Sequence, residues 1–516
     1  MNVHRGIRSK WAKVMLTGLT TGALLISAFA GSASADVRLP AVVGSNMVLQ
    51  RDKPIHLWGW ASPDEKVTVT LGDESKTTTA DAEGNWSVDL NELPAGGPHQ
   101  ISIAGNNTVT LDNVLVGEVW VCSGQSNMEW GVRSSTNGEQ EIANAKYPKI
   151  RLFHIPKVPS GTPQDNVNAA WVECSPETIP NFSAVSYFFG LRLYQELDIP
   201  VGLINTSWGG TRIEPWTTIN GFKSVPALSS IVDMIGQANA AYVEQCAATI
   251  ELLKNDWLPK AQAAAAAGEP IPTPPAWPAH ALNANQQPTG LYNGMVHAIH
   301  PLAVRGAIWY QGESNLTEGM LYHEKMKALI HGWREFWGEE MPFYFVQLAP
   351  FKYGAAPDLL PQIWEAQTAT LAVPHTGMAV TTDIATTDNI HPPNKQDVGK
   401  RLALWALAKT YGKRDLVYSG PLFKSMSIKG NKAILSFDHV GGGLASRDGQ
   451  PLSHFAIAGE NGAFVPAEAK IEGETLVVTA DQVEKPQAVR FGWDQLAEPN
   501  LMNTEGLPAS PFRTDK

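Results

Sequence analysis

A chain of 516 residues is too long for one ordinary domain, so its length predicts two to four domains. Hydrophobic residues make up 43% of the chain and charged residues 17%, a globular composition that excludes a disordered or fibrous protein. The formal net charge is −11, and the chain lacks long basic runs. This balance argues against nucleic acid or an anionic membrane surface as a partner.

The first 35 residues have the pattern of a secretory signal peptide. Four basic residues precede a mostly apolar stretch from Met15 to Ala30, and Ala33-Ser34-Ala35 has the small-x-small form of a cleavage site. The apolar stretch is short and is interrupted by Thr and Gly, which disfavours a permanent membrane anchor. We therefore expect cleavage near Ala35 and export to the periplasm or the medium, with no anchor remaining.

The chain has three cysteines, Cys122, Cys174 and Cys246. Cys122 belongs to a predicted strand, where a buried thiol is expected. A disulfide between Cys174 and Cys246 could form after export, and the sequence leaves this pairing open.

Residues 36–113 have an all-β pattern. Segments 56–60, 66–70 and 85–89 alternate between apolar and polar residues, and turn residues separate them. This predicts a small sandwich-like module. Such a module could bind sugar or brace its neighbour, and we favour bracing because no cluster of exposed ligand-binding residues stands out.

Residues 114–415 alternate between strand and helix patterns, which predicts an α/β domain. Strands are expected at 114–121, 150–154, 201–205, 304–310, 341–348 and 378–382, and helices at 184–196, 322–336 and 392–411. An Ala-rich and then Pro-rich insertion interrupts the domain at about 225–280, as either a lid or a spacer. Residues 416–516 are β-rich and predict a second sandwich-like module.

Four loops of the α/β domain follow predicted strands and carry the residue types that acyl transfer needs. Ser126 ends the first strand and is the candidate nucleophile, which requires a base to remove its proton. His391 is the candidate base. Asp388, three residues earlier on the same loop, could fix the imidazole tautomer and stabilise the imidazolium.

The oxyanion formed in such a reaction needs hydrogen-bond donors. The candidates are the backbone amides of Ser126 and of Gly210 or Gly209, and the side-chain amides of Asn315 and Gln311. If Asn315 is a donor, the Asn315→Ala variant should fold normally and lose orders of magnitude in turnover.

Other residues in these loops have less certain roles. Glu313 is an alternative acid for His391, although the spacing of Asp388 favours Asp388. Candidate substrate contacts lie beside the serine and the paired glycines: Gln125, Arg212 and Trp216. Arg212 could instead form a salt bridge with Glu214 or another acid.

Five motifs occur in order along the chain: GQSNMEW, NTSWGGTRIEPW, PTGLYNGMVH, IWYQGESN and DNIHPPNKQDVGKRLA. Together they resemble the sialate O-acetylesterases and related carbohydrate acetylesterases of the SGNH hydrolase superfamily. The resemblance covers most of the chain after residue 35, including the ending from Gly506 to Thr514. It implies a three-layer α/β/α catalytic domain between two β-rich modules, with a Ser126–His391–Asp388 triad.

The resemblance also implies hydrolysis of O-acetyl esters on sugars through an acetyl-serine intermediate. O-acetylated sialic acid is the leading expected substrate, and acetylated xylan or another polysaccharide is the alternative. A third hypothesis, a carbohydrate-binding protein without activity, is disfavoured by the intact set of Ser126, Asp388 and His391. A sialic acid site must meet a carboxylate, so a cleft arginine such as Arg212 would favour it.

No cofactor and no metal are expected. His297 and His300 lie three residues apart, but no carboxylate or thiol ligand set accompanies them, which favours packing roles. The sequence leaves the oligomeric state open.

Overall fold

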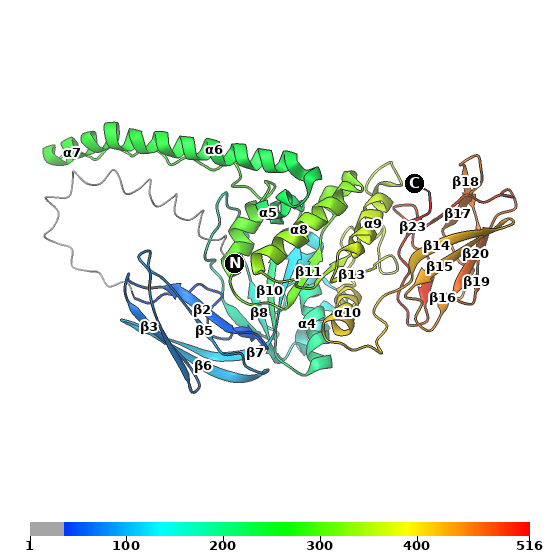
Figure 1. The fold of residues 1–516 in the computed structure, drawn as a ribbon, viewed down its shortest axis with the longest axis horizontal. Coiled ribbons are helices and arrows are strands. Elements are labelled where there is room, and N and C mark those ends of the chain that lie inside the picture. Colours follow the sequence, from blue (N-terminus) through cyan, green and yellow to red (C-terminus); the bar gives the residue numbers. More distant parts are fainter. Residues whose placement is uncertain (1–35, 516) are drawn as a thin grey trace.

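The computed structural model describes residues 36–515, and the predicted signal peptide at residues 1–35 lies outside this range. The described chain forms an N-terminal β module, a central α/β domain and a C-terminal β module, arranged in that order along the long axis of the molecule (Figure 1). Within residues 36–515, no helix has both the length and the apolar character needed to cross a bilayer.

The N-terminal module contains the first six strands: β1 (Val48–Gln50), β2 (Ile55–Trp60), β3 (Lys66–Leu71), β4 (Glu74–Thr79), β5 (Asn85–Leu90) and β6 (Gly96–Ala104). Strand β2 pairs with β5, and β3 pairs with β4 and β6, all antiparallel. Buried and exposed residues alternate strictly along β5, as expected for a sheet with one face on a core.

Strand β7 (Thr108–Gly124) is 17 residues long and belongs to both the N-terminal module and the central domain. Its first part pairs antiparallel with β6, and its later part pairs parallel with β10 and β11. The domain boundary predicted between residues 113 and 114 therefore falls inside one continuous strand.

The central sheet has the strand order β13-β12-β11-β7-β10-β8-β9. Its other strands are β8 (Tyr147–His154), β9 (Trp171–Cys174), β10 (Val201–Ser207), β11 (Gly306–Tyr310), β12 (Phe343–Val346) and β13 (Thr376–Ala379). All neighbours are parallel except β8 and β9. Because β7 lies in the middle, its carboxyl end opens at the centre of one sheet edge, where α/β proteins bind ligands.

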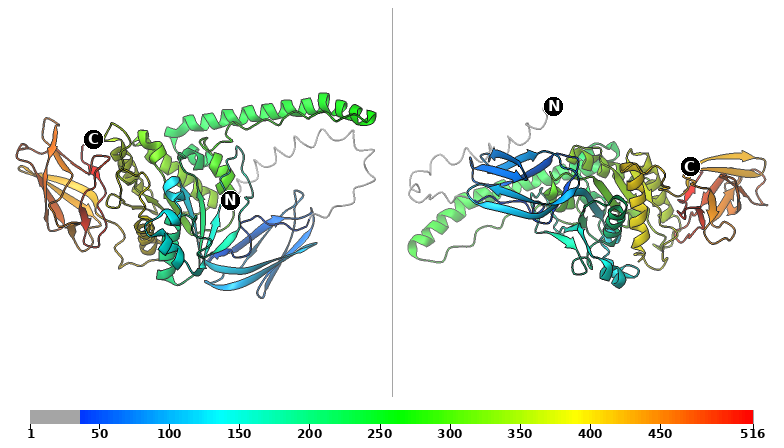
Figure 2. Two further views of the ribbon diagram at one scale, coloured as in Figure 1. Left: turned by 180° about the vertical axis from the view of Figure 1, so that it is seen from behind. Right: turned by 90° about the horizontal axis from the view of Figure 1, so that it is seen from below.

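Helices cover both faces of this sheet (Figures 1 and 2). They are α4 (Ala184–Leu197) and α10 (Lys395–Trp405) on one face, and α5 (Ile219–Lys223), α8 (Leu321–Trp337) and α9 (Leu359–Ala369) on the other. Trp120 of β7 packs on Phe189 of α4 with ring centroids 5.0 Å apart. Trp309 of β11 packs on Trp333 of α8. The predicted three-layer α/β/α class is confirmed.

A helical rod interrupts the central domain where the insertion was predicted. It consists of α6 (Ser229–Leu252), a π-helical turn at Leu253–Trp257 and α7 (Leu258–Ala267), and residues 269–280 follow without helix or strand. A small core containing Phe222, Leu228 and Ile235 anchors its base. The rod projects away from the body of the molecule (Figure 2).

The C-terminal module has its own hydrophobic core between two antiparallel four-stranded sheets. One sheet contains β14 (Leu422–Lys429), β15 (Lys432–Asp438), β20 (Thr475–Thr479) and β19 (Glu468–Glu472). The other contains β18 (Phe464–Pro466), β17 (Phe455–Ala458), β21 (Ala488–Phe491) and β23 (Phe512–Arg513), while β16 (Leu444–Ser446) pairs with β22 (Leu501–Asn503). Arg513 forms a 2.9 Å salt bridge with Glu365 of α9 and so ties this module to the central domain.

The three cysteines are free thiols in the structure. Cys122 and Cys174 are buried, and burial raises the pKa of each thiol to about 12. The Cys174–Cys246 disulfide that the sequence left open is not formed.

Candidate active site

Ser126 lies directly after the carboxyl end of β7, at the start of the short helix α2 (Ser126–Glu129). The turn depends on Gly124, whose φ is +143°, and a Cβ at this position would lie 2.1 Å from the Tyr310 carbonyl oxygen. Only glycine permits this close approach of β7 to β11. Gln125 then ties the two strand ends together, because its Oε1 accepts hydrogen bonds from the Gly312 and Ser314 amides at 3.4 and 3.3 Å.

His391 contacts Ser126 although the two residues are 265 positions apart in the sequence. The distance between His391 Nε2 and Ser126 Oγ is 2.8 Å, a hydrogen bond. The imidazole stacks on the indole of Trp130, with centroids 5.0 Å apart and planes 20° apart. Trp130 is itself fixed by donating from Nε1 to the Ser134 carbonyl at 2.8 Å. The imidazole is therefore held between the serine hydroxyl and an anchored ring.

The surroundings of His391 favour its neutral form. Burial is the main cause that lowers the pKa of His391, and the positive charge of Lys395 lowers it further, while Glu129 acts in the opposite direction. A neutral imidazole can accept the serine proton. The lowered pKa of His391 thus favours the form of the imidazole that can accept a proton.

A buried polar network lies behind the serine and the histidine. Lys395, the first residue of α10, is fully buried, and its Nζ donates to Asn127 Oδ1 at 2.5 Å. Asn127 Nδ2 in turn donates to Glu313 Oε1 at 2.6 Å and to the Ile390 carbonyl at 3.0 Å. One amide therefore joins the loops that follow β7, β11 and β13.

Burial shifts both ionisable ends of this network toward neutrality. Burial lowers the pKa of Lys395 to about 7, although the negative charge of Glu313 favours the ammonium form. It also raises the pKa of Glu313. Glu313 Oε2 is buried and has no hydrogen-bond partner within the described chain.

Sequence reasoning missed Trp130, Glu129 and Lys395 as parts of this site. The signals were present: Glu129 and Trp130 follow Ser126 by three and four residues, and Lys395 follows His391 by four. Their partners could not be identified, because the contacts join loops that lie far apart in the sequence.

The loop after β10 lies beside Ser126, and the backbone amides of its two glycines, Gly209 and Gly210, differ in their hydrogen bonding. A Cβ on Gly209 would lie 3.2 Å from Ser126 Cβ. The Gly209 amide donates to Glu129 Oε2 at 2.5 Å, so it is not free to bind an oxyanion. The amides of Ser126 and Gly210 donate no hydrogen bond to any group in residues 36–515. Of the predicted backbone donors, these two remain available.

Gln311 and Asn315 lie in a buried network rather than at an open donor site. Gln311 Nε2 donates to Asn315 Oδ1 at 2.7 Å and to the Thr211 carbonyl at 3.2 Å. Asn315 Nδ2 donates to the carboxylates of Glu214 and Glu318 at 3.0 and 3.1 Å. All the side-chain donors of these two amides thus have protein acceptors. The structure gives no support to their predicted oxyanion role and assigns them to holding the loops.

Arg212 forms the salt bridge that the sequence had suggested as its alternative role. Its guanidinium contacts Glu214 at 3.1 Å and also Glu318. The buried Lys325 binds the same two carboxylates at 2.7 Å each. Although burial opposes ionisation, the charge and hydrogen bond of Lys325 hold the pKa of Glu214 at about 2.

Trp216 is fully buried, and its Nε1 donates to Thr211 Oγ1 at 3.1 Å. Its carbonyl accepts a hydrogen bond from Trp333 Nε1 at 2.9 Å. Trp216 has no surface to offer a ligand, so the structure gives no support to the prediction that it contacts substrate.

Neither predicted acid hydrogen-bonds His391 within the described chain. Asp388 is exposed on the loop before the histidine, and the Asn389 side chain accepts from the His391 backbone amide at 2.9 Å. Glu313 is linked to the site through Asn127 instead.

Within residues 36–515, no three His, Cys, Asp or Glu side chains gather as a metal site would require. Of the two histidines considered from the sequence, His297 Nδ1 lies 2.9 Å from the Gln164 carbonyl oxygen. His300 packs on Phe336 with centroids 4.2 Å apart.

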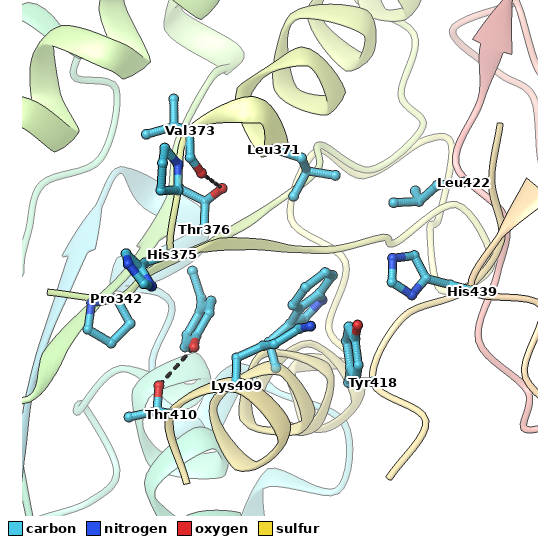
Figure 3. A pocket seen from close by; sticks show the side chains of 13 residues that line it. Pro342, Leu371, Val373, His375, Thr376, Lys409, Thr410, Tyr418, Leu422 and His439 are labelled. Carbon is cyan, nitrogen blue, oxygen red and sulfur yellow. Dashed lines mark hydrogen bonds between the residues drawn. The ribbon is translucent and has the colours of Figure 1, made fainter. Parts of the chain in front are cut away.

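A cavity of about 430 Å³ lies between the central domain and the C-terminal module, lined by Tyr344, Trp405, Lys409, Tyr418 and His439 among others (Figure 3). Pro342 and His375, which also line it, directly precede β12 and β13. Strands β7, β11, β12 and β13 are parallel, so this cavity lies at their amino ends. Ser126 lies at the opposite edge of the sheet.

The buried position of Asn315 changes the expected outcome of its replacement. The Asn315→Ala variant should lose about 3 kcal/mol or more of unfolding free energy, because Gln311, Glu214, Glu318 and the Ile213 amide would lose a buried partner. Urea unfolding measures this loss, with the exposed Asn91→Ala variant as the control. Unchanged stability combined with a large loss of turnover would restore the oxyanion assignment.

Comparisons with known proteins agree on one family. A family model described as carbohydrate esterase, sialic acid-specific acetylesterase, matches residues 265–408. The sialate O-acetylesterase of Rattus norvegicus is 31% identical over 95% of this chain and 96% of its own length, and that of Mus musculus is 30% identical over 81% of each. The crystal structure of a carbohydrate acetylesterase from Xanthomonas citri is 37% identical, covers 93% of this chain and 100% of its own, and has a TM-score of 0.79. The chain therefore belongs to the sialate O-acetylesterase family of carboxylic ester hydrolases.

Proposed function

We propose that this protein hydrolyses O-acetyl esters on carbohydrates, with Ser126 as nucleophile and His391 as base. The observation that carries the proposal is the 2.8 Å hydrogen bond between His391 Nε2 and Ser126 Oγ. It lies at the carboxyl end of the central strand β7, where the fold leaves a reactive side chain accessible. Family membership supports the reaction class.

In the first half of the reaction, His391 takes the proton of Ser126 as Oγ attacks the acetyl carbonyl carbon. We assign the stabilisation of the oxyanion to the amides of Ser126 and Gly210, and each such donor contributes about 3 kcal/mol to lowering the barrier. Collapse of the intermediate breaks the bond to the sugar oxygen, which takes the proton from the imidazolium. The sugar leaves with a free hydroxyl, and Ser126 carries the acetyl group.

In the second half, water takes the place of Ser126 as the attacking group. His391 takes a proton from the water as the water oxygen attacks the acetyl carbonyl carbon. His391 then returns the proton to Ser126 Oγ as acetate leaves. The stack of Trp130 on the imidazole keeps His391 Nε2 directed at the reacting atoms through both halves.

Asp388 remains our proposed acid for His391. It precedes the histidine by three residues on the same exposed loop, and a loop carboxylate can close on the imidazole when substrate binds, since catalytic hydrogen bonds often tighten only in the complex. Glu313 is the alternative, because it is linked to Asn127 next to the nucleophile.

O-acetylated sialic acid is the leading candidate substrate, because the curated relatives that cover most of the chain are sialate O-acetylesterases. One observation favours acetylated neutral polysaccharide such as xylan as the second candidate. Arg212, which would have met a sialic acid carboxylate, is already neutralised by Glu214 and Glu318.

We also propose that the protein acts outside the cytoplasm, in the periplasm or the medium. The support is the pattern of the first 35 residues, a basic start, an apolar stretch and a small-x-small cleavage site at Ala33-Ser34-Ala35.

The Ser126→Ala variant should release no acetate above background from p-nitrophenyl acetate, O-acetylated sialic acid or acetylated xylan, because the nucleophile is gone. Enzymatic measurement of acetate, with thermal unfolding as the check of folding, tests this. The exposed Ser230→Ala variant is the matched control and should retain activity. Turnover in Ser126→Ala would remove Ser126 from its role, and the wild-type rates on the two sugar esters decide between the candidate substrates.

The pH profile should depend on Lys395. The charge of Lys395 lowers the pKa of His391, so the Lys395→Met variant should raise that pKa. Because His391 must be neutral, the acid limb of the kcat/KM profile should move to higher pH. The Lys400→Met variant, which removes an exposed lysine of the same helix, should leave the limb in place. An unmoved limb in Lys395→Met would contradict this coupling.

If Asp388 is the acid, the Asp388→Asn variant should lower kcat by about 10²-fold or more, because the imidazolium loses its stabilising charge. The Glu313→Gln variant keeps the hydrogen-bonding shape of the buried network and should lose much less. Steady-state kinetics on p-nitrophenyl acetate compare the two, and the opposite order would transfer the role to Glu313.

A further inference from the structure

A second candidate site lies between the N-terminal module and the central domain. A cavity of about 600 Å³ opens on the outward face of β2 and β5. Side chains of β2, β4 and β5 form one wall, and Asp165, His297, His300 and Pro301 of the central domain contribute to the other. Strands β2 and β5 lie on the side of the module that faces the projecting rod of α6 and α7 (Figure 1). Neither Ser126 nor His391 lines this cavity.

Strand β2 presents a row of three rings to this cavity. Its residues alternate between buried and half-buried, so Ile55 and Leu57 face the core while His56, Trp58 and Trp60 face outward. Successive outward side chains on a strand are spaced by roughly 7 Å. The rings of His56 and Trp58 have centroids 5.8 Å apart and planes inclined by 30°. The row therefore forms a shallow aromatic platform that stays partly open to water.

Polar side chains of β5 border the platform. The antiparallel register places Asn85 opposite Trp60, Ser87 opposite Trp58 and Asp89 opposite His56. All three polar residues are exposed. The sequence alone shows no cluster of exposed ligand-binding residues in this module, because the pairing of β2 with β5 brings the rings and polar groups together.

This combination matches the two surfaces of a sugar. A pyranose ring has an apolar C–H face, which packs against an aromatic ring, and a rim of hydroxyl groups, which need hydrogen-bond partners. Binding sites for small molecules commonly join apolar ring surfaces with a few polar groups that fix orientation. A row of rings along one strand fits a chain of sugars better than a single sugar.

The charges of the cavity favour a neutral chain. Its lining in the described structure has no lysine or arginine and includes two acids, Asp81 and Asp165, which would repel an anionic sugar. Asp165 lies 3.5 Å from His297. Arg38 lies at the end of the row, 6.0 Å from the centre of the Trp60 ring, and is exposed.

We propose that this face of the N-terminal module binds a neutral oligosaccharide chain, with sugar rings stacked on Trp58 and Trp60 and sugar hydroxyls bonded to Asn85 and Ser87. The choice of a glycan as the ligand rests on the proposed carbohydrate acetylesterase function. The site itself uses none of the residues assigned to ester hydrolysis. It gives the module a role in holding the acetylated glycan at the enzyme, in addition to bracing the central domain.

Calorimetric titration with unacetylated xylohexaose, cellohexaose and mannohexaose tests the proposal, because these probes offer no ester to the active site. At least one should bind the wild-type protein, and the Trp58→Ala and Trp60→Ala variants should each weaken that binding by at least 10-fold. The Trp277→Ala variant is the control, because this indole is 54% exposed and lies outside the cavity. It should bind the oligosaccharide and hydrolyse p-nitrophenyl acetate as the wild type does.

Thermal unfolding checks that each variant folds, and the Asn85→Ala variant replaces Trp58→Ala if that variant does not. The proposal is overturned if none of the three oligosaccharides binds the wild type, or if binding survives both tryptophan replacements. Tighter binding of sialyllactose than of all three neutral chains would overturn the assignment to a neutral ligand. Hydrolysis of p-nitrophenyl acetate by the wild type is a separate measurement, so failure of the proposed function is distinguished from failure of this site.

Discussion

The side-chain amide of Asn127 is the interaction on which the geometry of the candidate site depends. It accepts from Lys395 and donates to Glu313 and to the Ile390 carbonyl, so the loops after β7, β11 and β13 meet at one buried group. A buried polar network stabilises one arrangement only when its members find partners, and an unpaired member is costly. The network therefore selects a single relative position for Ser126 and His391. Their short contact is a consequence of this amide as much as of the two strands that carry them.

Much of the fold could be predicted from the periodicity of apolar residues along the sequence. Strands β8, β10, β11, β12 and β13 and helices α4 and α8 lie within a few residues of their predicted bounds, because buried parallel strands are nearly continuous apolar runs. Strand β9 was not predicted. Helix α10 begins at Lys395 rather than at Pro392, since Asn394 caps it by accepting from the Asp397 amide. The continuity of β7 across the predicted boundary could not be read from the sequence, because it depends on which strands pair with each half.

The sequence alone singled out Ser126 and His391, which are in contact in the structure, but not the residues around them. The serine and histidine could be selected because each follows a predicted strand with the residue type that the chemistry requires. Asn315, Gln311 and Trp216 have equally suggestive positions, yet they lie in buried networks and the core. Sequence shows that a side chain can donate a hydrogen bond, but only the fold shows whether a neighbouring carboxylate or carbonyl already accepts it. The part that Lys395 plays in the site could not be predicted for the same reason, because its partner Asn127 lies 268 residues away in the sequence.

Strand β7 connects the N-terminal module directly to the turn that carries Ser126. One end pairs with β6 of that module, and the other end stops two residues before Ser126. A chain cut at residue 114 would keep every residue of the proposed reaction but lose the strands that pair with the front of β7. No cut between the N-terminal module and the central domain therefore leaves both sets of β7 pairings intact.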